Sequence, residues 1–473
     1  MSYSLTFNGV KKPYITLGIG KRRSAFAPLT RNLLKMPGMA GAYLESTDTD
    51  IRVIQQPINI EGKDRYDLRK LEEEIALWLI TKEPAELIFD DEPDRVYYAV
   101  VDGSLDIEDI VNFGQGTITF ICPDPYKYGV EKPVKGATSA SFINNGTVES
   151  EPIIRCEIKQ DTTFVVVSNG EELNIIGNYG QVDELPYEPE TRVLWDQMGA
   201  ITGWSPSTSV EEGISVGTMK SNGHEFYTDD YGGGGGWHGP AIKKSIGQTL
   251  QDFKIDVLMS QLGVTGQVGS IEVALLDSNN QFVAKLLLTK RSANNPAVYA
   301  TLRAGKYDSG NDVMSSRGAN DTTWANFDGI LRLIRKGNQW AAYVSKIDSN
   351  GNHHTSLYRA WNDTEGIAIA PITQVQVQLW QYASVSPTNQ RVKDIKVFKI
   401  NEQSTGIPYV ARVGDVIEFD HKNDNILRNG ESIIKDKMFV GKYFSIKPGL
   451  STITVEPAEA IESTEVRWRE KWR

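Results

Sequence analysis

The segment TQVQVQLWQYA, residues 373–383, alternates apolar and polar side chains with the period of a β-strand. One face of the predicted strand is apolar, and the other carries Gln376, Gln378, Trp380 and Tyr382. Aromatic rings can stack on the C–H faces of sugars while amides hydrogen-bond the hydroxyls, so the polar face predicts a saccharide-binding surface. The alternative is that this face packs beneath a loop, and the sequence leaves both interpretations open.

A second candidate is the glycine-rich segment YGGGGGWHGP, residues 231–240. It is not a phosphate-binding loop, because no Gly-Lys-Ser/Thr follows it and no strand-to-helix context surrounds it. The consecutive glycines predict a mobile lip, with Tyr231 at its start and Trp237 and His238 at its end. These three side chains are candidate saccharide contacts, the alternative being a loop that only folds onto the sheet.

Patterns of catalytic carboxylates give no support for an enzyme. Glycoside hydrolysis on a jelly-roll sheet would use Glu-x-Asp-x-x-Glu on one strand, and residues 187–405 contain no such string. Glu418 and Asp420 share a predicted strand face but lack a third acid. Because spacing brings no nucleophile, base and orienting group together, the sequence predicts no catalytic residues.

Metal and cofactor sites are not predicted either. His353 and His354 are adjacent on a predicted strand and would point to opposite sides, so they could not hold one metal together. Residues 48–50 and 348–351 have oxygens that suit calcium, but neither stretch continues into a twelve-residue ligand loop. We expect no metal and no cofactor, and calcium stays open without support.

Length, charge and cysteine content exclude several classes of protein. The length of 473 residues predicts a multidomain globular protein. The formal net charge of −11 indicates that nucleic acid is not its main partner, because phosphate binding needs clustered Lys and Arg. Cys122 and Cys156 are too few for a disulfide framework, and we expect two buried thiols. The absence of long apolar runs and of a secretory signal predicts no membrane insertion and assembly in a cytoplasm.

Short alternating runs between Gly, Ser, Asn and Asp predict a mainly β protein of stacked antiparallel sheets. One helix is expected between Asp64, as its N-cap, and Pro84. A sandwich that begins at Ala137 breaks off near Pro186, and similar short strands return only after Ile407. The Trp-rich stretch between them predicts a complete domain inserted into a surface loop of the sandwich.

Several segments, in order along the chain, resemble the distal tail protein family of long-tailed phages that infect Gram-positive bacteria. In the N-terminal part they are SLTFNGV, MPGMAGAY, IRVIQQPINIEG and the strand that ends in CPDPYKYG. In the C-terminal part they are NNGTVESEPIIRCEI, GDVIEFDHKNDNILRNG, YFSIKPGLSTITV and the tail VRWREKWR. The resemblance spans roughly half of the chain.

This resemblance implies four segments. The first is an N-terminal ring-forming β domain with one covering helix, residues 1–130. A galectin-like C-terminal sandwich follows in two parts, residues 131–186 and 406–473. Between these parts lies an inserted jelly-roll domain, residues 187–405. The family also implies a hexameric ring of this chain with itself at the virion tail tip. That ring joins the tail tube protein to tail-tip proteins, lysins or receptor-binding proteins.

Two further implications concern the joint and the insert. In TFICPDPYKYG, Pro123 and Pro125 end a strand, and the family makes this stretch a joint between ring domain and sandwich rather than the lip of an active site. The insert looks like a concanavalin-like or laminin-G-like jelly roll, and enlarged family members carry carbohydrate-binding modules there, which implies binding to host cell-wall saccharide. Two alternatives are a polysaccharide-degrading enzyme and a pure scaffold with a non-binding insert.

Overall fold

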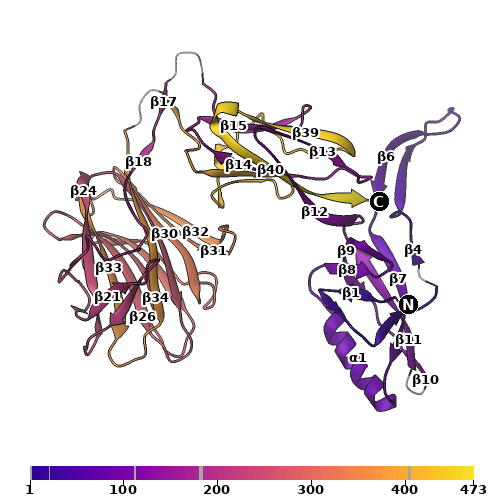
Figure 1. The fold of residues 1–473 in the computed structure, drawn as a ribbon, viewed down its shortest axis with the longest axis horizontal. Helices are drawn as coiled ribbons and strands as arrows, with labels where there is room; N and C mark the ends of the chain where they lie inside the picture. Colours follow the sequence, from indigo (N-terminus) through magenta and orange to yellow (C-terminus); the bar gives the residue numbers. More distant parts are fainter. Residues whose placement is uncertain (1–2, 21, 111–112, 181–184, 403–405) are drawn as a thin grey trace. The chain divides into compact units, whose positions relative to one another are not determined.

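The computed structural model describes residues 3–20, 22–110, 113–180, 185–402 and 406–473, and Figure 1 shows its fold. The protein is mainly β, as predicted, with one α-helix in the part of the chain so described. None of the helices in those ranges is long and apolar enough to cross a membrane. The chain forms two compact units: the first combines residues 1–176, 411–426 and 434–473, and the second combines residues 177–410 and 427–433.

The N-terminal part of the first unit is built from antiparallel strands and one helix. Its elements are β1 (Leu5–Phe7), β2 (Val10–Lys11), β3 (Ile15–Leu17), β4 (Arg22–Arg23), β5 (Leu29–Leu34), β6 (Tyr43–Thr49), β7 (Arg52–Glu61), α1 (Arg65–Leu79), β8 (Ala85–Phe89), β9 (Glu92–Asp102), β10 (Glu108–Ile110) and β11 (Phe113–Cys122). β11 pairs with β7 along its whole length and also with β9, and β8 and β1 continue the sheet beyond β9. The sheet thus presents a continuous face to the helix.

Helix α1 covers this face, as the sequence predicted. The side chain of Asp64 accepts a hydrogen bond from the backbone N–H of Asp67, which is the predicted N-cap. Leu68 and Ile75 are buried against the sheet, and the indole N–H of Trp78 donates to the carbonyl of Phe7 at 3.0 Å. The helix therefore closes a core that the strands alone would leave open to water.

Strands β5 and β6 form a hairpin that we call the arm, residues 29–49. The two strands pair with each other, and nearly all of their residues are exposed on both faces. Figure 1 shows the arm extending from the rest of the N-terminal part. Its exposed apolar side chains are Leu33, Leu34, Met36, Met39, Tyr43 and Leu44. Soluble monomers rarely leave such a contiguous apolar surface uncovered.

The C-terminal sandwich combines strands from both sides of the insert. They are β12 (Lys127–Gly136), β13 (Ser139–Asn144), β14 (Ile153–Ile158), β15 (Phe164–Ser168), β16 (Leu173–Gly177), β36 (Val416–Asp420), β37 (Asn425–Arg428), β38 (Glu431–Ser432), β39 (Gly449–Glu456) and β40 (Ile461–Trp472), with short 3-10 turns η1 (Ile434–Asp436) and η2 (Ala458–Ala460). β14 pairs with β36 and β40, and β13 and β15 pair with β39. Strands that precede the insert therefore pair with strands that follow it, which confirms the interrupted sandwich.

His421 is a buried histidine of this sandwich whose Nδ1 accepts a hydrogen bond from the Phe444 N–H at 2.9 Å. Burial lowers the pKa of His421 to about 4, against the opposing effect of Asp420. The folded chain thus keeps the imidazole neutral, while the unfolded chain binds a proton below about pH 6.5. Stability should therefore be unaffected by His421 above pH 6.5 and fall by up to about 3 kcal/mol as the pH drops toward 4.

Unfolding of wild type and His421→Gln between pH 4 and 7 checks this expectation. Glutamine keeps an acceptor for the Phe444 N–H and removes the titration. The free energy of unfolding of wild type, minus that of the variant, should fall as the pH is lowered through this window. A difference that stays constant with pH would contradict the assignment.

The insert is a two-layered jelly roll. Its strands are β17 (Pro186–Tyr187), β18 (Glu190–Asp196), β19 (Ser205–Pro206), β20 (Ile214–Ser215), β21 (Thr218–Ser221), β22 (Phe226–Asp230), β23 (Trp237–Gly239), β24 (Ala241–Leu250), β25 (Phe253–Leu262), β26 (Gly269–Leu276), β27 (Phe282–Lys290), β28 (Val298–Ala304), β29 (Asn311–Ser316), β30 (Phe327–Lys336), β31 (Gln339–Ile347), β32 (His353–Asn362), β33 (Ile372–Tyr382), β34 (Asn389–Ile400) and β35 (Ile407–Pro408). An eight-stranded sheet centred on β34, β25 and β30 faces a nine-stranded sheet centred on β33, β26 and β27. One apolar cluster, including Trp324 and Trp340, fills the space between them.

The two ends of the insert lie side by side. β17 and β35 pair in parallel, with Pro186 opposite Ile407 and Tyr187 opposite Pro408. Adjacent ends are what a surface loop needs to accept a guest domain. The predicted ranges 1–130, 131–186, 187–405 and 406–473 stay a prediction, and their boundary at Thr405 lies outside the described residues.

Candidate functional site

The stretch at residues 119–129 connects the N-terminal part to the sandwich. β11 ends at Cys122, and β12 begins at Lys127 after the two prolines. Tyr128 of β12 pairs with Val96 of β9, while the rest of β12 pairs with β40 of the sandwich. Burial raises the pKa of the Cys122 thiol to about 12, so it is not a nucleophile at neutral pH. The geometry is that of a joint.

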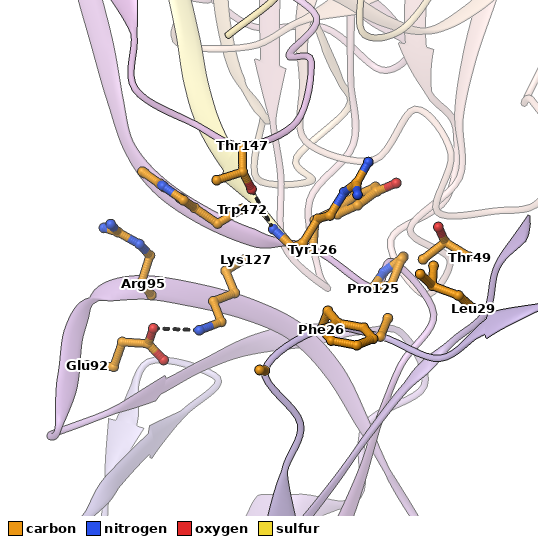
Figure 2. A pocket seen from close by; sticks show the side chains of 13 residues that line it. Phe26, Leu29, Thr49, Glu92, Arg95, Pro125, Tyr126, Lys127, Thr147 and Trp472 are labelled. Carbon is orange, nitrogen blue, oxygen red and sulfur yellow. Dashed lines mark hydrogen bonds and ion pairs between the residues drawn. The ribbon is translucent and has the colours of Figure 1, made fainter. Parts of the chain in front are cut away.

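A cavity of about 550 Å³ lies at this joint (Figure 2). Phe26, Tyr126 and Trp472 are among its lining side chains. Its charged groups are engaged with their neighbours, since Lys127 Nζ is 2.7 Å from Glu92 and the Arg95 guanidinium lies 3.5 Å from the centre of the Trp472 ring. The cavity is a mostly apolar hollow and holds no free acid–base pair among Glu92, Arg95 and Lys127.

Three residues predicted to form an open saccharide face are instead buried. Gln376, Gln378 and Trp380 lie on the outer face of β33, the face turned away from the core, but each is almost fully covered. Over Gln376 this cover is a loop at residues 207–213, which we call the cover segment. Gln376 Nε2 donates to the Ser209 carbonyl of this segment at 2.7 Å. The prediction of an open face at these three residues is therefore corrected in favour of the packed alternative.

His238 and Tyr231 are also placed differently from the mobile lip that the glycines predicted. His238 is buried, and its Nδ1 donates to the Gly236 carbonyl at 2.9 Å. Tyr231 follows β22 of the opposite sheet, and burial raises the pKa of its hydroxyl. His238 is thus covered, while Tyr231 is half-buried.

Trp237 and Tyr382 are the sequence-predicted residues that the structure brings together. They are paired between β23 and β33, with ring centres 5.2 Å apart and ring planes at 68°. Tyr382 is 43% exposed and Trp237 is half-buried. This aromatic pair, at the C-terminal end of β33, remains able to stack on a ligand.

A buried charge cluster beneath the cover segment was not predicted from the sequence. Lys285 Nζ is 2.5 Å from Glu211 of the cover segment and 3.2 Å from Glu272 of β26. Lys285 is 2% exposed and Glu272 is 6% exposed. Burial raises the pKa of Glu272, whereas the two carboxylates outweigh burial and raise the pKa of Lys285. A sequence signal existed, because Glu272 and Lys285 each interrupt a nearly continuous apolar strand.

A pocket of about 500 Å³ lies beside this cluster, at the end of the sheet opposite to Tyr382. We call it the turn pocket. It is bounded by the cover segment at residues 209–211, the β26–β27 turn at residues 280–282 and the β28–β29 turn at residues 306–308. Tyr307, in the last of these turns, is 55% exposed. The sequence pattern does not indicate this tyrosine as a site residue, because it lies in a turn and not on a strand with alternating side chains.

The two carboxylates of the buried cluster, Glu211 and Glu272, are both ion-paired to Lys285. A retaining or inverting enzyme needs one free carboxylic acid and one free carboxylate across an accessible bond. The part of the chain that the structure describes also contains no cluster of three His, Cys, Asp or Glu that could hold a metal ion.

Two family models match the chain on either side of the insert's main body. A phage tail protein RIFT-related domain matches residues 11–122, and the C-terminal domain of a siphovirus-type tail component matches residues 376–472. A curated distal tail protein from Bacillus phage SPP1 is 31% identical over 128 residues. The chain is thus similar to siphophage tail proteins on both sides of the insert. The second match begins in β33, so its first residues lie within the jelly roll.

The similarity to that distal tail protein is partial in sequence. The aligned region covers 27% of this chain and 51% of the SPP1 protein, so the chain spans about half the length of the curated relative that it matches. The region of this chain between the two family-model matches extends from residue 123 to residue 375. Most of the insert is thus additional to the segments that define the distal tail protein family.

Solved structures show similar folds at low identity. The match to the crystal structure of the SPP1 distal tail protein extends over 100% of this chain and 100% of that protein, with a TM-score of 0.41 and 12% identity. The CBM2 module of the evolved distal tail protein of Lactobacillus casei BL23 phage J-1 covers 46% of this chain and 99% of that module, with a TM-score of 0.40 and 16% identity. A Bacillus licheniformis β-glucanase covers 44% of this chain and 98% of the enzyme, with a TM-score of 0.30 and 11% identity. None of these TM-scores reaches 0.5, so none bears on function.

Proposed function

We propose that this chain is a structural, non-enzymatic distal tail protein that forms a hexameric ring at the virion tail tip and carries a saccharide-binding insert. The ring joins the tail tube protein to tail-tip proteins, lysins or receptor-binding proteins after assembly in the host cytoplasm. The observation that carries the proposal is the match of tail-protein models to both ends of a chain whose sandwich closes around a complete jelly roll.

The arm supports ring formation. A closed ring uses two different surfaces on each subunit, so each subunit must offer a patch that its neighbour covers. The apolar side chains of the arm are exposed on both faces of a two-stranded hairpin. Burying them against a neighbouring copy would remove this apolar surface from water.

The aromatic pair supports saccharide binding by the insert. Trp237 and Tyr382 form an edge-to-face pair with Tyr382 open to solvent, and such rings provide flat apolar surface for a sugar. A single lectin site of this kind binds weakly. Six copies on one ring would gain a factor of about 10² to 10⁴ through multivalency if the host wall presents repeated sugars.

Deleting the insert tests this function. We expect a variant in which Pro186 is joined to Gly406 to keep its hexameric state and to lose at least about 100-fold in apparent affinity for purified host cell walls. The adjacent ends of the insert make this join possible. Equal binding by rings of the full-length chain and rings that lack the insert would contradict the saccharide-binding proposal and favour the pure scaffold.

The enzyme alternative makes a different prediction. A polysaccharide-degrading jelly roll would release reducing sugar steadily from host wall polysaccharide, and the release would vanish in Glu211→Gln or Glu272→Gln. We expect no release from wild type, because both carboxylates are engaged by Lys285. Release that depends on either carboxylate would replace the structural function with a catalytic one.

A further inference from the structure

We propose that the turn pocket is the insert's saccharide subsite, that it binds one neutral pyranose residue, and that Tyr307 is its stacking surface. This inference rests on the proposed function, because it names where and what the insert binds. It differs from the sequence prediction, which centred on the face of β33. Its structural support has four parts: an open aromatic ring, a turn that is already ordered, fixed polar groups and the charge of the lining.

The first part is the exposure of Tyr307. Its side chain is 55% exposed in the turn between β28 and β29, and it lines the turn pocket. Phe282 lines the same pocket and is nearly buried. The exposed ring of Tyr307 is therefore the one available for a sugar face.

The second part is that the turn carrying Tyr307 is held in place without a ligand. The Arg303 guanidinium donates to the carbonyls of Lys306 at 2.9 Å and Gly310 at 3.1 Å, and also to the carbonyl of Tyr307. Its remaining nitrogen is 2.6 Å from Asp312. One arginine therefore fixes both ends of the turn, so binding would cost little ordering entropy.

The third part is a set of fixed polar groups around the pocket. The carboxylate of Glu211 accepts from the backbone N–H of Tyr307 at 3.1 Å and from Lys285 at 2.5 Å, which ties the cover segment to the turn. Asn280 Oδ1 accepts from Gln374 at 3.0 Å, which fixes the amide and leaves its NH₂ as a donor for a hydroxyl. Fixed polar groups beside an exposed aromatic ring are typical of sites that bind small polar ligands.

The fourth part is the charge of the lining. Glu211 and Asp308 are acidic, and Lys306 is the basic side chain that lines the same pocket. Lys306 already donates to Gln281 at 3.0 Å. This balance disfavours uronates and phosphates, which need an excess of cationic donors. The volume of about 500 Å³ has room for one sugar residue, and the ion pair between Glu211 and Lys285 lies beside it.

Saturation-transfer NMR on the full chain tests the subsite. The probes are the methyl glycosides of glucose, galactose, rhamnose and N-acetylglucosamine, with methyl glucuronide as the anionic probe. We expect transfer to at least one neutral glycoside and none to the glucuronide. Tyr307→Ala should weaken binding at least about 10-fold, and Tyr307→Trp should retain it. The matched control is Tyr358→Ala, because Tyr358 is 58% exposed elsewhere on the insert and its loss should change nothing.

The outcomes separate this inference from the proposed function. If wild type binds a neutral glycoside and Tyr307→Ala binds equally well, the subsite is wrong while saccharide binding stands. If Trp237→Ala abolishes binding and Tyr307→Ala does not, the site is the aromatic pair. Glucuronide binding as strong as that of the neutral sugars overturns the ligand class. No transfer from any neutral glycoside overturns the subsite, and the wall-binding comparison with the insert-deleted ring then decides the function separately.

Discussion

Replacing Leu33, Leu34 and Leu44 with serine is expected to convert the proposed hexameric ring into monomers. These leucines are exposed in the single chain, on a hairpin whose strands pair with each other. Burying a leucine stabilises an interface by about 2 kcal/mol. Three of them at each contact amount to about 6 kcal/mol, which corresponds to roughly four orders of magnitude in the dissociation constant. Sedimentation velocity at micromolar concentration measures the change directly.

A matched control separates this effect from a general loss of apolar surface. Leu262, Val264 and Ile367 are similarly exposed, but they lie on the insert. Serine at these three positions should leave the hexamer intact. The assignment of the arm to the ring contact fails if the arm variant sediments as wild type does, or if both variants dissociate equally.

The second large effect is expected from Lys285→Met. Removing this cation leaves the buried carboxylate of Glu272 without its partner and releases Glu211 from the sheet. Breaking a buried ion pair by removing one member costs about 3–5 kcal/mol. For a domain of this size that corresponds to a fall of about 10 °C in the melting temperature of the insert. Scanning calorimetry can identify the insert's transition as the one that the deletion variant lacks.

Two further variants test the cause of the Lys285→Met effect. Adding Glu272→Gln should recover most of the loss, because the buried charge is then removed together with its partner. Lys306→Met removes an exposed lysine near the same pocket and should change the melting temperature little. If the double variant is no more stable than Lys285→Met, the loss is due to packing and not to an uncompensated charge.

Much of the fold followed from local patterns. The helical spacing with Asp64 as N-cap predicted α1, although the helix ends at Leu79, before Pro84 is reached. The change in texture between Pro186 and Ile407 predicted a guest domain, and the pairing of β14 with β36 confirms the interrupted sandwich. Both cysteines are buried free thiols, as expected. These features depend on periodicity, capping and composition, which are local properties of a sequence.

The site was harder to predict, for a physical reason. Strand alternation placed Gln376, Gln378 and Trp380 on the outer face of β33, and that assignment of faces is correct. Alternation cannot show that a loop about 165 residues earlier in the chain covers the face, because this depends on tertiary contacts such as that of Gln376 with Ser209. Tyr307 was passed over because a turn has no face to assign, and its importance depends on Arg303 and Glu211.

Electron micrographs of the purified full chain would show directly whether it assembles into a ring. We expect class averages with six-fold symmetry, and a native mass of six times 52.6 kDa in the same sample. Particles the size of one chain, or rings with another number of subunits, would contradict this expectation.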